Sequence, residues 1–476
     1  MRMKWAGHFK WLILFVLLFF FVTESAVGAQ TISVTDLGTL GGNSSHALGM
    51  NNLGHIVGSS TSPSGMPRAF FWSAEGGLRD LGTLGGDYSE ALSVNTRGQV
   101  VGGSSTKEGN WRGFIWSAEG GMVNLGTLGG NSSHALRAND LGHVAGTSSN
   151  ASGSDRLFFW TPEKGMVDIG SFGGLYSEIA GMNNQGQIVG SSVNESWETR
   201  AFLWTPDGQM ADLGSLGGEY SYALAVNDHG QVVGGSGTAS GETRPFFWTP
   251  EGGMMGLGTL GGNFSEATAV NNLGQVVGRS YIESGSYRAF LWTLQGGIVD
   301  LGTLGGNFSE ASAINDRGQV VGRSTNSSGE WRAFLWTAKG GMVDLGTLGG
   351  PFSQAHAIND RGQIIGDSRN AEKATHATLW SVPSSTPEEQ VKELIAEVER
   401  LIRSQEIRKE FGKALIFELQ VVLKKIQREK MKGACHLLHA FIHQVKVLVK
   451  AHRLSFPDGR ALLDKAQEVS ICQPRT

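Results

Sequence analysis

Cysteine is almost missing from this sequence. Only Cys435 and Cys472 occur among 476 residues, both near the C-terminal end, so the chain can form at most one internal disulfide. In an exported protein such a pair predicts that Cys435 and Cys472 are bonded to each other. The chain-entropy model assigns this bond roughly 3–4 kcal/mol of stabilisation.

Long apolar runs are equally scarce, and the one candidate lies at the N-terminus. Basic residues precede the apolar stretch 11–22, and small residues follow it up to Ala29. The stretch is short for a membrane span of ~20 residues, so the pattern predicts a signal peptide over residues 1–29 rather than a retained anchor. No later segment is apolar enough to span. We therefore expect a secreted or cell-envelope protein without a membrane span once the signal peptide is removed.

An excess of positive charge is missing from the body of the chain. Residues 30–383 carry 19 Lys and Arg against 30 Asp and Glu, a net charge of −11, whereas residues 384–476 carry 17 against 12. Nucleic acid phosphates require a basic protein surface. The composition therefore argues against a nucleic acid partner.

Glycine, by contrast, is abundant, and most of the 70 glycines are set in a regular repeat. The segment LGG, or FGG at residues 172–174, recurs every 44 residues, and a tryptophan keeps the same spacing from Trp72 to Trp380. Each unit contains four short segments that read as strands, which in one unit are residues 309–315, 319–324, 332–336 and 342–348. A repeat of ~40–45 residues without a helical pattern indicates one four-stranded propeller blade per unit.

The two ends of this array predict how it closes. It opens at residues 32–40 with a fourth-type strand that lacks the other three, and it stops after a third-type strand at 377–381. Together the two ends make one complete blade, so the first strand would join the last blade and remove the exposed sheet edges. The sequence thus predicts an all-β, eight-bladed β-propeller over residues 30–383, with an open solenoid as the alternative.

Several polar positions recur in the repeat and invite structural interpretations. Asn51 and Gly54, with their equivalents in all eight units, predict a tight turn with glycine at positive φ. An arginine stands four residues before each tryptophan, with His376 as the exception, and predicts an arginine–aromatic stack between blades. A recurring aspartate, of which Asp36 is the first, predicts a structural hydrogen-bond acceptor.

The segments RAFLW, LGTLGG and NDRGQVVG, with HATLW at residues 376–380, resemble those of the HAF family of bacterial extracellular repeat proteins. The resemblance covers about residues 31–383. It implies secretion and a propeller-like fold, and it implies no activity.

The sequence contains no recognisable catalytic or metal-binding set. A phosphate loop, a metal-ligand cluster and a Ser/His/Asp arrangement are all missing, so we expect a protein that is not an enzyme, with no catalytic residues, no metal and no cofactor. Carboxylates could in principle act in pairs as acid and base, but their recurrence at one repeat position favours a structural or binding role. These residues are Glu90, Glu178, Glu266 and Glu310.

Aromatic residues indicate a binding face instead. In an antiparallel blade the fourth-to-first and second-to-third connections emerge on the same face, and in this chain they carry variable aromatic residues beside Asn, Glu and His. Such rings suit stacking on a sugar or a peptide, although they could merely cap the core. The predicted ligand-binding residues are Tyr88, Trp111, Tyr176, Trp197, Tyr220, Phe264, Phe308, Trp331 and Phe352.

The glycine pattern ends at residue 384, and residues 384–476 predict a four-helix module. Thr386, Pro387 and Glu389 form a helix-start signature, and further helices are expected at about 405–428, at 431–452 and after residue 453. The third helix is amphipathic. Its polar face includes His439 and His443, whose spacing without a third ligand is more typical of a solvated surface than of a metal site.

Within this region, ALIFELQVVLKKI, LLHAFIHQVKVLV and LSFPDGRALLDKA resemble the FIMAH-type helical module of secreted bacterial proteins. The resemblance covers residues 386–470 and implies an accessory, envelope-proximal role. Taken together, the sequence predicts a secreted, non-catalytic binding scaffold for an extracellular glycan, a cell-wall polymer or a protein. The alternatives are a purely structural envelope component and a glycan-active hydrolase or lyase.

Overall fold

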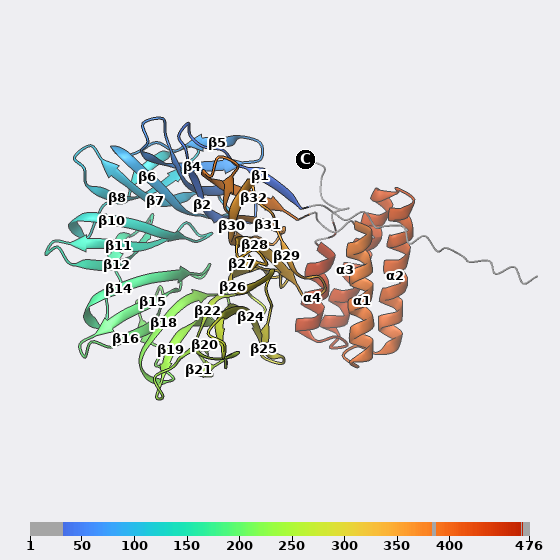
Figure 1. Ribbon diagram of the computed structural model, residues 1–476. Helices are drawn as coiled ribbons and strands as arrows, with labels where there is room; N and C mark the ends of the chain where they lie inside the picture. The colour runs from blue at the N-terminus through green and yellow to red at the C-terminus, as the bar shows by residue number, and fades with distance from the viewer. Residues whose placement is uncertain (1–31, 383–386, 468, 470–476) are drawn as a thin grey trace, which may run out of the picture. The chain divides into compact units, whose positions relative to one another are not determined.

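The computed structural model describes residues 32–382, 387–467 and 469 (Figure 1). The predicted signal peptide, the predicted helix cap Thr386 and the predicted disulfide partner Cys472 lie outside the described residues. Residues 32–382 form strands and residues 387–467 form helices, as predicted.

Each repeat contributes four strands. The first strands are β2 (Ser45–Met50), β6 (Gly85–Val94), β10 (Gly129–Ala138), β14 (Gly173–Met182), β18 (Gly217–Val226), β22 (Gly261–Val270), β26 (Gly305–Ile314) and β30 (Gly349–Ile358). The second strands are β3 (Ile56–Thr61), β7 (Val100–Thr106), β11 (Val144–Asn150), β15 (Ile188–Asn194), β19 (Val232–Thr238), β23 (Val276–Ile282), β27 (Val320–Asn326) and β31 (Gln363–Asn370). The third strands are β4 (Pro67–Ser73), β8 (Trp111–Ser117), β12 (Asp155–Thr161), β16 (Thr199–Trp204), β20 (Thr243–Thr249), β24 (Tyr287–Thr293), β28 (Trp331–Thr337) and β32 (Thr375–Ser381). The fourth strands are β5 (Gly77–Asp80), β9 (Gly121–Asn124), β13 (Gly165–Asp168), β17 (Met210–Asp212), β21 (Gly253–Gly256), β25 (Gly297–Asp300), β29 (Gly341–Asp344) and β1 (Ser33–Asp36).

Consecutive strands pair antiparallel into four-stranded sheets, which follow one another in colour order from blue to gold in Figure 1. A single parallel contact, Thr243 with Phe264, joins two neighbouring sheets. The predicted closure is confirmed: β1 pairs antiparallel with β32, with Ser33 opposite Ser381 and Asp36 opposite Thr378. This part of the chain is a β-propeller.

The fourth strands are shorter than predicted. The strand expected at 342–348 is β29, which ends at Asp344, and the first strand ends at Asp36 rather than at residue 40. The reason is a glycine two residues after each aspartate: Gly346 has a φ of 77° and Gly38 of 77°, which turns the chain out of the sheet.

Apolar packing joins each sheet to the next. Phe70 in β4 is fully buried, and it belongs to one cluster with Ala47, Ile56, Ile365 and Leu379, which come from the first and last repeats. The position of Ala47 holds alanine in seven of the eight repeats, and all seven are buried. Because alternate residues of a strand point to opposite faces, each sheet contributes to two such clusters.

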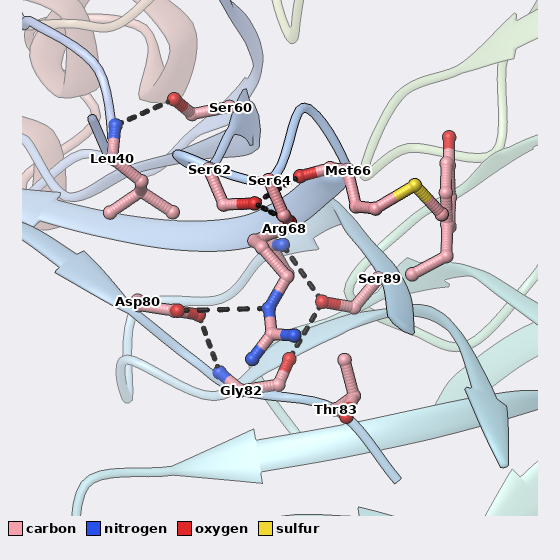
Figure 2. A network of polar contacts seen from close by, with 12 residues as sticks. Leu40, Ser60, Ser62, Ser64, Met66, Arg68, Asp80, Gly82, Thr83 and Ser89 are labelled. Atoms are coloured by element: carbon pink, nitrogen blue, oxygen red, sulfur yellow. Dashed lines mark hydrogen bonds and ion pairs between the residues drawn. The ribbon is translucent and has the colours of Figure 1, made fainter. Parts of the chain in front are cut away.

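Polar contacts also join neighbouring sheets (Figure 2). Ser89 in β6 donates to the carbonyl of Gly82 at 2.6 Å and accepts from the amide of Ala69 at 2.9 Å, linking β4 to the next sheet. Asp80 Oδ1 accepts from the amide of Gly82 at 2.8 Å, which confirms the structural acceptor role predicted for this aspartate series.

The predicted arginine–aromatic stack is wrong. Arg68 Nε lies 3.6 Å from Asp80 Oδ2 in the neighbouring strand of its own sheet (Figure 2), and Arg200 and Arg332 likewise pair with glutamates. Among the described residues, the arginines that lie over aromatic rings belong to other repeat positions. A carboxylate within reach offers the guanidinium a stronger, charge-assisted contact than a ring does.

The turns between first and second strands form a ring of asparagines. Each asparagine Nδ2 donates to the main-chain carbonyl of the equivalent asparagine in the next repeat at 2.7–3.2 Å, and Asn359 donates back to Asn51. The members of this asparagine ring are Asn51, Asn95, Asn139, Asn183, Asn227, Asn271, Asn315 and Asn359, all buried. The predicted turn glycine is confirmed at Gly54, with a φ of 86°.

A cavity of about 280 Å³ lies inside the asparagine ring. Residues that follow the ring members line it, including Asn184, Asp228, Asn272 and Asp316. Their side chains accept from main-chain amides of the preceding repeat, as Asp228 does from Asn184 at 2.9 Å. The first strands and their turns therefore surround a common axis.

The helical part contains α1 (Pro387–Arg403), α2 (Lys409–Gln427), α3 (Met431–Lys450) and α4 (Phe456–Gln467). The start at Pro387 agrees with the prediction, whereas α2 begins after the predicted 405 because Gln405, with a φ of 62°, turns the chain. The predicted amphipathic character of α3 agrees with the structure, in which Ala434, Leu438, Phe441 and Val445 are buried in the shared core. Among the described residues, no helix is long and apolar enough to cross a membrane.

The asparagine ring predicts a large cost for removing one member. In Asn183, Nδ2 donates to Asn227 O at 2.9 Å, and Oδ1 accepts from the amides of Gln185 and Gln187. We expect Asn183→Ala to lower the free energy of unfolding by about 2–3 kcal/mol, because it leaves buried main-chain groups unpaired. Urea denaturation measures this loss.

The exposed Gln185 lies in the same turn and provides the control. Gln185→Ala should change stability by less than about 0.5 kcal/mol. Equal effects of the two substitutions would contradict a stabilising role for the ring.

Candidate functional site

The predicted binding face carries two separate groups of side chains. Both lie where the fourth-to-first and second-to-third loops meet the first three strands of the repeats, opposite the asparagine ring along each strand. Antiparallel pairing within every sheet brings these loops to the same face. The nine predicted residues are divided among several clusters rather than gathered in one.

The larger group is a continuous row of rings that we call the aromatic strip. It comprises Phe264, Tyr281, Tyr287, Phe308 and Trp331, which come from two consecutive repeats. Successive ring centroids are 5.8, 5.5, 5.0 and 6.4 Å apart. All five side chains are half-buried, so each ring is held by its neighbours while part of it stays accessible.

Two arginines hold the aromatic strip against acidic partners. Arg279 Nε donates to Glu266 Oε1 at 2.8 Å, and its Nη1 lies 3.4 Å from Glu310 Oε2 in the next repeat. Its guanidinium carbon lies 5.5 Å from the ring centroid of Phe264 and 5.8 Å from that of Tyr287. One side chain thereby fixes two carboxylates and two rings.

Arg323 repeats this arrangement one unit later. Its Nε donates to Glu310 Oε1 at 2.7 Å, and its guanidinium carbon lies 4.6 Å from the ring centroid of Trp331. Cation–π contacts of this kind add to the ion pair. Glu310 is thus shared by Arg279 and Arg323, which makes the network continuous across sheets.

The network extends beyond the strip at one end through Tyr222. Its hydroxyl donates to Glu266 Oε2 at 2.9 Å. Burial, together with the charge of Glu266, raises the pKa of Tyr222. This phenol is therefore a permanent donor at neutral pH.

At the other end the network reaches the junction of the last and first repeats. Asp367 in β31 is buried and lies 3.0 Å from His46 in β2 and 3.3 Å from His356 in β30. Burial alone would raise the pKa of Asp367, but hydrogen bonds from His356 and His46 lower it to about 2. The bond to Asp367 in turn raises the pKa of His46.

The second group lies on β6, β8 and β10. The rings of Tyr88 and Trp111 are 5.0 Å apart, and those of Trp111 and His134 are 5.1 Å apart. Glu90 lies beside them without an arginine, and burial raises its pKa. Burial also lowers the pKa of His134, so its imidazole is neutral at neutral pH.

The remaining predicted residues do not join either group. Tyr176 and Trp197 are 60% and 76% exposed, and Tyr176 donates to Glu178. Tyr220 stacks on Tyr222, and Phe352 packs under Arg369.

Sequence reasoning missed the arginines and two tyrosines of the strip. Arg279, Arg323, Tyr281 and Tyr287 were not among the predicted residues. The available signal was the position of Arg279 and Arg323, which holds Ser, Gly, Thr or Asp in the other repeats. A large charged side chain at an otherwise small position requires a partner nearby.

The helical part offers a basic face on α3. Six exposed residues form it, namely Lys432, His436, His439, His443, Lys446 and Lys450. Within the described ranges, no group of three or more His, Cys, Asp or Glu is placed to hold a metal ion.

No family model matches the chain, and no curated protein matches it. Solved structures that resemble it include the β-propeller domain of the Trilobed protease from Pyrococcus furiosus, with 11% identity, a TM-score of 0.44, and coverage of 64% of this chain and 99% of that one. Puromycin hydrolase gives 14% identity, a TM-score of 0.42, and coverage of 70% and 59%. TolB from Acinetobacter baumannii gives 13% identity, a TM-score of 0.34, and coverage of 51% and 61%. The chain thus spans less than two thirds of the latter two proteins.

The Asp367 cluster should contribute most to stability at mildly acidic pH. Its ionised carboxylate stabilises the fold fully above pH 3.8 and ceases to do so as the pH falls through about 2. Protonated His46 stabilises the fold fully below pH 6.5, and this contribution is lost as the pH rises through its raised folded-state pKa. The contribution of this cluster to stability should therefore be largest between about pH 4 and 6.5, and urea denaturation at several pH values measures it as the difference between the wild-type protein and a variant of His46.

His46→Gln provides the comparison for this profile. The variant should lack the part of the decline above pH 6.5 that belongs to His46. Parallel profiles for the two proteins above pH 6.5 would contradict the assignment.

Proposed function

We propose that the protein is a non-catalytic, secreted scaffold that binds an extracellular glycan along the aromatic strip. We further infer that residues 30–383 form an eight-bladed β-propeller whose last blade is completed by β1. The observation that carries the functional proposal is the unbroken row of half-buried rings from Phe264 to Trp331.

Physical features of the strip support a sugar ligand. The apolar face of a sugar ring packs on aromatic rings, while its hydroxyls need fixed polar partners. Glu266, Glu310 and the two arginines supply such partners beside the rings. Because the rings hold one another, binding would cost little side-chain entropy.

The same contacts argue against hydrolysis at the strip. Glycoside hydrolases need one carboxyl group free to donate a proton and another free to attack or to activate water. Here Glu266 and Glu310 both pair with Arg279, and Glu310 pairs with Arg323 as well. These carboxylates are used to hold the surface together.

An array of glycans and cell-wall polymers probed with the full chain tests the proposal. Wild-type protein should bind at least one class of polymer, and Trp331→Ala should weaken that binding by about tenfold, because one stacked ring contributes on the order of 1 kcal/mol or more. The stability of both proteins is measured in parallel.

Trp197→Ala is the matched control, since it removes an exposed tryptophan outside the strip. It should bind as wild type does. Loss of binding in both variants, or in neither, would contradict the strip as the site, and absence of binding by the wild-type protein would favour a structural envelope component.

A further inference from the structure

In the repeat that contains Glu90, the residues that surround Arg279 and Arg323 in two other repeats have counterparts, but the arginine itself is absent. The same repeat positions form the surroundings of Arg279 and of Arg323: Glu90 corresponds to Glu266 and Glu310, and Trp111 corresponds to Tyr287 and Trp331. Where those repeats have arginine, this one has Gly103. The strand register makes the comparison direct, since Glu90 lies opposite Gly103 as Glu266 lies opposite Arg279 and Glu310 opposite Arg323.

The groups that would receive a guanidinium are in place. Trp111 and Tyr88 offer ring faces, as Trp331 does for Arg323 at 4.6 Å. Glu90 is half-buried, and among the described residues no hydrogen bond or ion pair to its carboxylate is found. Its pKa is raised by burial alone, which is the signature of a carboxyl group that lacks a cationic neighbour.

The residues around Glu90 do not neutralise its carboxylate. His134 takes the place that Glu310 has beside Arg279, and burial lowers its pKa, so a neutral imidazole faces the site at neutral pH. Arg112 is directed elsewhere, with Nη1 donating to main-chain carbonyls of Trp111 and Asn131. Trp111 Nε1 is buried and has no hydrogen-bond partner among the described residues.

The indole of Trp111 lies against Gly103. A Cβ added to Gly103 would lie 2.5 Å from the ring, so the indole occupies the space where an arginine side chain would leave the main chain. A guanidinium therefore has to come from outside the chain. Glu90 is accessible to such a group because it is only half-buried.

We propose that Glu90, Tyr88 and Trp111 form a binding site for an arginine side chain of a protein partner. The guanidinium pairs with the Glu90 carboxylate and stacks on the Trp111 ring, in the way that Arg323 pairs with Glu310 and stacks on Trp331. The site lies in a different repeat from the aromatic strip. The proposed arginine site can therefore be tested independently of glycan binding.

Three small molecules test whether the site recognises a guanidinium group, any positive charge, or only the shape of the side chain. Isothermal titration of the full chain is carried out with the Nα-acetyl methylamides of arginine, lysine and citrulline. Arginine should bind at least about tenfold more tightly than its neutral isostere citrulline, because a hydrogen-bonded charge is lost. Equal binding of citrulline, equal binding of lysine, or no binding of arginine would each overturn the proposal.

Two variants and one control locate the binding. Glu90→Gln should weaken arginine binding at least about tenfold, and Gly103→Arg should block it by supplying the missing guanidinium within the chain. Gly103→Arg requires the Trp111 ring to move off Gly103, to a position such as the one that Trp331 takes beside Arg323; should the variant fail to fold, Glu90→Gln still decides. Glu178→Gln changes the equivalent carboxylate, which already bonds to Tyr176 and Ser191, and should leave binding within about twofold of wild type. Unchanged binding in Glu90→Gln would overturn the assignment.

Discussion

The hydrogen bond from each ring asparagine to the next repeat is the contact on which the rest of the propeller depends. One side chain performs two tasks: Oδ1 shapes its own turn by accepting amides two and four residues ahead, and Nδ2 reaches the next turn. Both tasks require the turn to have one length and one conformation. A single residue inserted into this turn would move the amide out of reach, which explains why the turn has the same length in all eight units.

A fixed inner ring leaves the opposite face free to vary. At that face the first and second strands carry Glu opposite Arg in two repeats, Glu opposite Gly in a third, and Glu opposite Ser in a fourth. Each change is compensated locally, since Trp111 covers Gly103, and Ser191 donates to Glu178 at 3.1 Å. Variation of side chains without change of backbone is what a binding scaffold requires, because binding groups can differ while their positions stay fixed.

Periodicity was enough to predict the strands and their closure, because both depend on patterns that extend along the sequence. The orphan strands at residues 32–40 and 377–381 predicted the pairing that β1 and β32 make. Contacts between repeats were harder to predict. Asn183 looked like an ordinary turn residue, since nothing in its own turn reveals that its Nδ2 reaches Asn227.

In the candidate site, too, residues that are recognisable within one repeat were predicted, whereas contacts between repeats were not. Aromatic residues on one face could be recognised from loop composition, and Phe264, Phe308 and Trp331 do lie together. The arginines that organise them were missed because their partners, such as Glu310 for Arg279, belong to the neighbouring repeat. The arginine before each tryptophan was misassigned for a related reason: its partner, Asp80 for Arg68, lies on an adjacent strand.

The junction between the last and first repeats differs chemically from the others. His376 replaces the arginine found at this position elsewhere and pairs with Asp36 of β1 at 2.8 Å. Asp367 pairs with His46 and His356. Imidazoles change charge near neutral pH, whereas guanidinium groups do not. The contact between His46 and Asp367 therefore responds to pH, whereas β1 and β32 pair through their main chains and Asn359 bonds to Asn51. Ring closure thus combines pH-independent main-chain contacts with a pH-dependent ion pair between His46 and Asp367 at the place where the two ends of the array meet.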